Sequence, residues 1–122
     1  MFMKNCENCI STLTGTNIAI SPNDIIFEVC NYYDIYMTEV ISKKRDFHLV
    51  SIRHKIYDLL YSNTDLKMSL KYIGSFFMGK DHTTIIHGIQ QVKKFCEVYP
   101  EYRNEYIKLH LKIYGSLKYF KH

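Results

Sequence analysis

The segment IGSFFMGKDHTTIIHGI, residues 73–89, decides how this chain of 122 residues is interpreted. A short apolar stretch is joined to a longer one by Met78-Gly79-Lys80, and Asp81 stands where the N-cap of a second helix is expected. Two helices joined by a short turn that contains glycine are typical of a helix-turn-helix, whose second helix enters the major groove of DNA. The same polar residues could instead serve catalysis, so the rest of the sequence has to separate these two hypotheses.

Spacing along the second helix predicts which of its sides is buried. Apolar residues recur at intervals of four and three, at Ile85, Ile89, Val92, Cys96 and Tyr99. Polar residues fall on roughly the opposite side, at Thr83, Thr84, His87, Gln91 and Lys94. The polar cluster should therefore face outward, away from the core.

The remaining sequence predicts an all-α fold with about six helices. Ser21 as N-cap and Pro22 at the first helical position begin a helix over 22–33. Further helices are expected at 38–42, at 48–62, after Ser69, after Asp81, and from residue 100 to about 119. The buried edge of the last helix should be formed by Tyr106, Leu109, Ile113 and Leu117. No alternating pattern of a β-strand is present at useful length.

Composition and length favour one globular unit. Hydrophobic residues make up 47% of the chain and aromatic residues 15%, enough for a single core. The sequence contains neither the apolar region of a signal peptide nor a run of about 18 apolar residues, so a cytoplasmic, nucleoid-associated protein without membrane contact is expected. Cysteines in that compartment should be reduced.

The pair Cys6 and Cys9 has the C-x-x-C spacing of a zinc knuckle or a redox motif. A structural zinc site needs about four ligands, and the sequence has no second such pair. This favours an exposed terminal segment, with zinc shared between two copies of the chain as the alternative. No metal or other cofactor is expected.

Basic residues are concentrated in the centre of the sequence. Residues 42–94 contain ten Lys or Arg against four Asp, a net charge of +6, whereas the whole chain carries +4. A basic centre between less basic flanks indicates a surface that binds a polyanion. A solvated basic face without a ligand is the alternative.

Catalytic patterns are absent from the sequence. His82 and His87 are five residues apart, about 140° around a helix, so they cannot ligate one metal as histidines spaced by four do. No Ser-His-Asp or Cys-His order, no paired carboxylates and no G-x-x-x-x-G-K-[ST] phosphate loop is found. We therefore expect neither an enzyme nor a nucleotide-binding protein.

The segment SLKYIGSFFMGKDHTTIIHGIQQV, residues 69–92, resembles the C-terminal DNA-binding domain of the bacterial replication initiator DnaA. The pattern of that family runs S-L-x-x-I-G-x-x-F-G-G-R-D-H-T-T-V-x-H-A. The resemblance extends upstream over residues 20–60, which include the basic loop SKKR, and covers about 20–95 in all. It implies a helix-turn-helix of the DnaA C-terminal, Trp-repressor-like type.

Positions that match the family pattern imply roles in DNA binding. Base readout is implied for Asp81, His82 and Thr83 in the major groove and for Arg45 in the adjacent minor groove. Contacts to the DNA backbone are implied for Lys43, Lys44, Arg53, His54, Lys71, Lys80, Thr84 and His87. The sequence departs from the pattern at Met78 and Lys80, where the family has Gly and Arg, at Gly88 in place of Ala, and at His54 in place of Gln.

The resemblance implies sequence-specific binding of double-stranded DNA. We expect an N-terminal extension at 1–20, the DnaA-like domain at 21–98, and a C-terminal helix at 99–122 packed on that domain. Because the ATPase module of the family is not in the sequence, a stand-alone domain is expected that regulates replication initiation or transcription at DnaA-box-like sites, with protein partners in replication. The alternative is an adaptor that binds proteins through the same helices.

Overall fold

The computed structural model describes residues 21–122, and this range contains six helices and no strand. The helices are α2 (Pro22–Tyr33), α3 (Met37–Val40), α4 (Phe47–Ser62), α5 (Leu70–Ser75), α6 (His82–Val98) and α7 (Pro100–Tyr114). The all-α prediction with about six helices is confirmed. The predicted N-terminal extension and the Cys6–Cys9 pair lie outside the described residues.

Three predicted helix starts are confirmed, and in each the side chain of the cap accepts a hydrogen bond from a backbone amide of the first turn. Ser21 and Asp24 form a capping box at α2, in which the backbone N–H of Asp24 donates to Ser21 Oγ at 3.2 Å. The backbone N–H of Tyr72 donates to Ser69 Oγ at 3.0 Å, which fixes the start of α5. Asp81 caps α6. These residues satisfy amide groups that have no partner within the helix.

Two other helix starts differ slightly from the prediction. α3 begins at Met37 with Tyr36 as its N-cap, rather than at the predicted residue 38, and no side chain caps it. α4 begins at Phe47, one residue earlier than predicted, because Asp46 accepts hydrogen bonds from the amides of His48 and Leu49 at 2.8 and 3.3 Å.

The predicted end of the last helix, near residue 119, is wrong. α7 ends at Tyr114 because Gly115 adopts the left-handed conformation, with φ of 71°. Glycine adopts this conformation without the steric cost that other residues incur, so it commonly ends helices. As a result Leu117, which was predicted to be buried on this helix, lies beyond it and is exposed. Tyr99, predicted to lie on the apolar side of α6, is also exposed.

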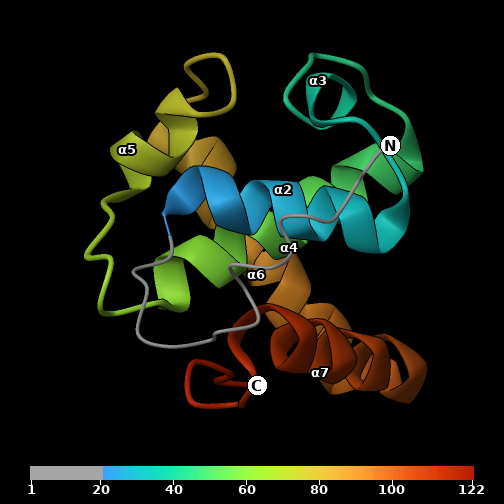
Figure 1. Ribbon diagram of the computed structural model, residues 1–122. Coiled ribbons are helices and arrows are strands. Elements are labelled where there is room, and N and C mark those ends of the chain that lie inside the picture. The colour runs from blue at the N-terminus through green and yellow to red at the C-terminus, as the bar shows by residue number, and fades with distance from the viewer. Residues whose placement is uncertain (1–20) are drawn as a thin grey trace.

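The core surrounds α4, which contacts α2, α3, α5 and α6 (Figure 1). The largest fully buried side chains include Ile25, Ile26, Ile52, Ile56, Tyr57, Leu59, Leu60, Ile73, Phe77, Ile85 and Tyr106. α7 packs against α6 and α2 and is tied to α4, since the Tyr106 hydroxyl donates to Asp58 Oδ2 at 2.5 Å and the Tyr114 hydroxyl donates to the Leu59 carbonyl at 2.8 Å. The loop after α3 and the turn before α6 lie on the side of the molecule opposite α7 (Figure 1).

Candidate nucleic-acid interface

The first turn of α6 presents polar groups to solvent and is organised by Asp81. Oδ1 of Asp81 accepts from the Thr84 amide at 3.1 Å, from the Thr83 hydroxyl at 2.8 Å and from the Thr84 hydroxyl at 3.0 Å. The hydrogen bond from the Thr83 side chain is the main cause that holds the pKa of Asp81 below its usual value. Within residues 21–122, Oδ2 of Asp81 has no hydrogen-bond partner, so it is free to accept from a ligand. Asp81, His82, Thr83 and Thr84 are all exposed.

The turn between α5 and α6 is held by a single carbonyl. The Gly74 carbonyl accepts from the amides of Phe77, Gly79 and Lys80 at 2.9, 3.1 and 3.2 Å. A Cβ atom at Gly74 would collide with the carbonyl oxygen of Lys80, so only glycine permits the two segments to approach this closely. This contact fixes the direction in which α6 leaves the turn.

Met78 occupies an unfavourable backbone conformation in the same turn. Its φ is 62°, and Gly79 follows with φ of 75°. An L-residue with a side chain pays a steric cost in this region. The position is one of those where the sequence departs from the family pattern, which has glycine.

The loop between α3 and α4 carries three exposed cations, Lys43, Lys44 and Arg45. Lys44 Nζ lies 3.6 Å from Glu39 Oε2, and both side chains are solvent-accessible. An exposed ion pair of this kind contributes little stability, so Lys44 can exchange its partner for a phosphate at small cost.

Arg53, a predicted backbone contact, lies beneath this loop and is bonded to the protein itself. Its side chain is 4% exposed, and its guanidinium donates to the carbonyls of Val40, Lys44 and Glu39 at 2.6, 2.6 and 3.2 Å. Each of the three guanidinium nitrogens thus donates to a backbone carbonyl of the protein. Its partners are the last turn of α3 and the loop itself.

Lys80, in the turn before α6, lies close to the cations of the basic loop. Partial burial lowers the pKa of Lys80, and repulsion from Arg53, Arg45 and Lys43 lowers it further. These cations therefore lie close enough to share one field, which extends from the loop to the start of α6. The basic surface is nevertheless smaller than the sequence indicated, because Lys55 as well as Arg53 is buried, with Lys55 Nζ placed 3.1 Å from Glu105 Oε1.

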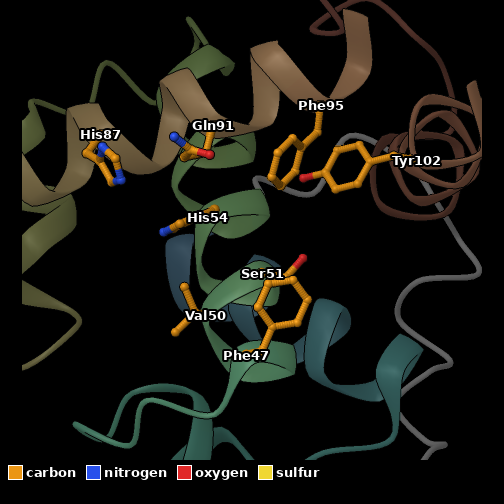
Figure 2. Close-up of a pocket in the computed structure, with 8 residues that line it drawn as sticks. All are labelled: Phe47, Val50, Ser51, His54, His87, Gln91, Phe95 and Tyr102. Atoms are coloured by element: carbon orange, nitrogen blue, oxygen red, sulfur yellow. The ribbon is translucent and has the colours of Figure 1, made fainter. Parts of the chain in front are cut away.

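His54 and His87 face each other across the α4–α6 contact, with ring centroids 6.1 Å apart (Figure 2). Burial, followed by repulsion from His87, lowers the pKa of His54 to about 4, so His54 is neutral near pH 7. It can offer a phosphate one N–H group but no charge. His87 is exposed, as is Lys71 on α5, and both remain predicted backbone contacts.

Gly88 allows this approach of α4 to α6. A Cβ atom there would lie 2.6 Å from Cδ2 of Tyr57 and 2.7 Å from Cδ2 of His54. Both distances are shorter than van der Waals contact allows. Glycine at residue 88, where the family pattern has Ala, therefore leaves room for the rings of Tyr57 and His54.

An apolar hollow next to the two histidines was not predicted from the sequence. It has a volume of about 200 Å³ and is lined by Phe47, Val50, Phe95 and Tyr102 together with polar residues of α4 and α6 (Figure 2). Phe47 is 82% exposed. The lining residues come from three different helices, α4, α6 and α7, so the sequence did not show that they meet. The only local sign of an exposed apolar residue was the position of Phe47 directly after the Asp46 cap.

Neither a metal centre nor a membrane segment is found among residues 21–122. No group of three or more His, Cys, Asp or Glu side chains there could hold a metal ion. None of the helices in this range has both the length and the apolar character needed to cross a bilayer.

Comparison with known proteins agrees with this geometry. The profile of the family described as "Bacterial dnaA protein helix-turn-helix" matches residues 22–92, which include α2 to α5 and most of α6. The chain belongs to the bacterial DnaA helix-turn-helix family. Its match to that family includes both elements of the candidate interface, the loop after α3 and the first turn of α6.

Several curated relatives are chromosomal replication initiator proteins DnaA. The protein of Neisseria meningitidis is 40% identical over 90 residues, which are 74% of this chain and 17% of the relative. Those of Zymomonas mobilis and Bacteroides fragilis are 34% and 33% identical over 88 and 87 residues, 72% and 71% of this chain and 18% of each relative. The chain thus spans less than a fifth of the length of these relatives. The matched region is the helix-turn-helix of this family.

Proposed function

We propose that this chain binds double-stranded DNA with sequence preference, and that it regulates replication initiation or transcription at DnaA-box-like sites. In this proposal α6 enters the major groove and the loop at 43–45 lies over the adjacent minor groove. The observation that carries the proposal is the exposed first turn of α6, where Asp81, His82 and Thr83 stand beside a cluster of cations.

Each of these side chains has a chemistry suited to a base edge. The free Oδ2 of Asp81 can accept from the amino group of cytosine. Because the Thr83 hydroxyl donates to Asp81, its methyl group is left for apolar contact with a thymine methyl. His82 is exposed and can donate or accept through its ring. Arg45 suits a narrow minor groove, where the negative potential attracts guanidinium groups.

Lysine residues around this surface supply contacts that do not depend on sequence. Lys43, Lys44 and Lys71 are exposed, and Lys80 is half-buried at the start of α6. Each phosphate that they neutralise releases counterions and makes binding weaker as salt rises. Thr84 and His87 extend this surface along α6 as predicted backbone contacts.

Substitutions at the two kinds of position test the proposal. His82→Ala and Thr83→Ala should each cost about 1 to 3 kcal/mol on the best duplex recovered from a random pool and leave scrambled duplex nearly unaffected. Lys44→Ala, the matched control on the loop, should weaken both duplexes alike. Fluorescence anisotropy titrations at fixed salt give all the affinities.

Equal losses on both duplexes for all three variants would contradict the assigned readout. If the unmodified protein shows no salt-dependent binding to any duplex, the alternative role gains support, which is an adaptor that contacts replication proteins through the same helices.

A further inference from the structure

Arg53 connects the two ends of the basic loop from inside the protein. Its Nε donates to the Val40 carbonyl and its Nη2 donates to the Glu39 carbonyl, both in the last turn of α3. Its Nη1 donates to the carbonyl of Lys44, within the loop itself. The guanidinium therefore supplies a donor to the Val40 carbonyl at the helix end. It is also a further donor to the Glu39 carbonyl, which accepts from the amide and hydroxyl of Ser42 as well, and it holds the loop against that end.

The Lys44 carbonyl is the group that matters for Arg45. A peptide unit is planar, and the unit that contains the Lys44 carbonyl also contains the amide nitrogen of Arg45. A 2.6 Å hydrogen bond to this carbonyl thus fixes the peptide plane from which Arg45 begins. Arg45 itself is exposed, and none of the hydrogen bonds within residues 21–122 involves its side chain.

We infer that Arg53 is a positioning residue for DNA recognition, which acts by holding the basic loop in the conformation that presents Arg45 to the minor groove. This inference rests on the proposed function. Arg53 makes no contact with DNA itself, because its side chain is 4% exposed and all three nitrogens are occupied by carbonyls. Order in the loop before binding lowers the entropy cost of fixing it on DNA.

Lysine cannot replace arginine in this arrangement. The three carbonyls are spread over residues 39 to 44 and are reached by a planar group with five N–H donors in a rigid fork. The ammonium group of a lysine has the same charge, but its donors lie on a single nitrogen, which cannot reach the carbonyls of Glu39, Val40 and Lys44 together. The variant Arg53→Lys therefore keeps the charge and removes the geometry, which separates positioning from phosphate neutralisation.

The test compares wild type, Arg53→Lys, Arg45→Ala and the double variant on the selected duplex and on scrambled DNA. Arg45→Ala should lose about 10-fold or more on the selected duplex. Arg53→Lys should lose a similar factor there, change little on scrambled DNA, and keep the wild-type salt slope. The double variant should bind about as well as Arg45→Ala alone, because both substitutions remove one interaction.

Two results would overturn the inference: wild-type affinity of Arg53→Lys for the selected duplex, or additive losses in the double variant. Wild-type protein that binds no duplex would overturn the proposed function as well, so the two failures are distinguishable.

A measurement on the unmodified chain covers the case in which Arg53→Lys does not fold. The Nε–H resonance of Arg53 in a ¹⁵N NMR spectrum should be protected from exchange in the free protein and should shift little when duplex is added. The Arg45 resonance should respond to DNA. Rapid exchange of the Arg53 signal in the free protein, or a large shift on DNA binding, would contradict the positioning role.

Discussion

Asp81 combines two roles at the scale of a single residue. Its Oδ1 caps α6 and gathers three donors, while Oδ2 is left free in the part of the chain that the structure describes. Capping and base readout therefore use different oxygens of one carboxylate. The three hydrogen bonds to Oδ1 also fix the position of Oδ2, because they leave the side chain little freedom to rotate.

The variant Asp81→Asn separates these roles. Asparagine caps helices about as well as aspartate does, so the melting temperature should stay near that of wild type. The amide group adds donors where the carboxylate only accepted, so the preferred base at the contacted position should change. Thermal denaturation and selection from random duplexes measure the two effects. A large fall in melting temperature with an unchanged site preference would make Asp81 a cap only.

Sequence reasoning placed Asp81 correctly as a cap but did not identify the partners of Arg53 within the protein, and chain distance explains the difference. The groups that donate to Asp81 lie within three residues of it, so the local pattern contains the information. The partners of Arg53 lie 9 to 14 residues away, and only the packing of α3 against α4 brings them together. Helical spacing does place Arg53 on the buried side of α4, four residues after Leu49 and three before Ile56, but it does not show which acceptors the guanidinium meets there.

At the scale of elements, the turn between α5 and α6 carries strain at Met78. With φ of 62°, this residue should be stabilised by replacement with glycine, and we expect Met78→Gly to raise the free energy of unfolding by about 0.5 to 1 kcal/mol. Met78 is 61% exposed, so little burial is lost. Urea denaturation measures the change.

Met78→Ala is the matched control for this turn. It removes the same side chain but leaves a Cβ atom in the left-handed conformation, so it should bring no gain. Equal stabilities of the glycine and alanine variants would show that the backbone at residue 78 is not strained.

Three of the four helix starts with a side-chain cap were predicted, the exception being α4 with Asp46, and the end of α7 was not. The starts of α2, α5 and α6 each have Ser or Asp at the cap, a pattern visible in the sequence. The end of α7 depends on Gly115, which the continuing apolar pattern to Leu117 concealed. The hollow beside His54 was not predictable, because its lining comes from α4, α6 and α7.

At the scale of the whole molecule, a buried histidine links stability to pH. His110 is fully buried among aromatic rings of α7 and the C-terminal segment, and both of its ring nitrogens lack hydrogen-bond partners within residues 21–122. Burial lowers its pKa to about 4, with Asp58 opposing and His122 adding to this effect. In the unfolded chain the pKa is about 6.5. Between these two pKa values the unfolded state binds a proton that the folded state does not bind. The free energy of unfolding therefore falls as pH falls from about 6.5 to 4.

Replacement of His110 by leucine should remove the share of this dependence that His110 contributes, while His54, whose pKa is also lowered to about 4, keeps its own share. His110→Leu loses no hydrogen bond, so at pH 7 it should be at least as stable as wild type. Between pH 7 and pH 5 it should lose about 2 kcal/mol less than wild type does. His48→Leu, at an exposed histidine, should keep the wild-type pH dependence. Urea denaturation at the two pH values decides, and parallel losses in His110→Leu and wild type would contradict the explanation.

The central claim is that α6 and the basic loop together bind duplex DNA with sequence preference. Anisotropy titration of the unmodified protein against a DnaA-box duplex and a scrambled duplex, at several salt concentrations, tests it most directly. We expect tighter binding to the box duplex at every salt concentration, and a log–log salt slope of about −4 if four or five phosphates are neutralised. Equal affinity for both duplexes, or affinity that does not change with salt, would contradict the claim.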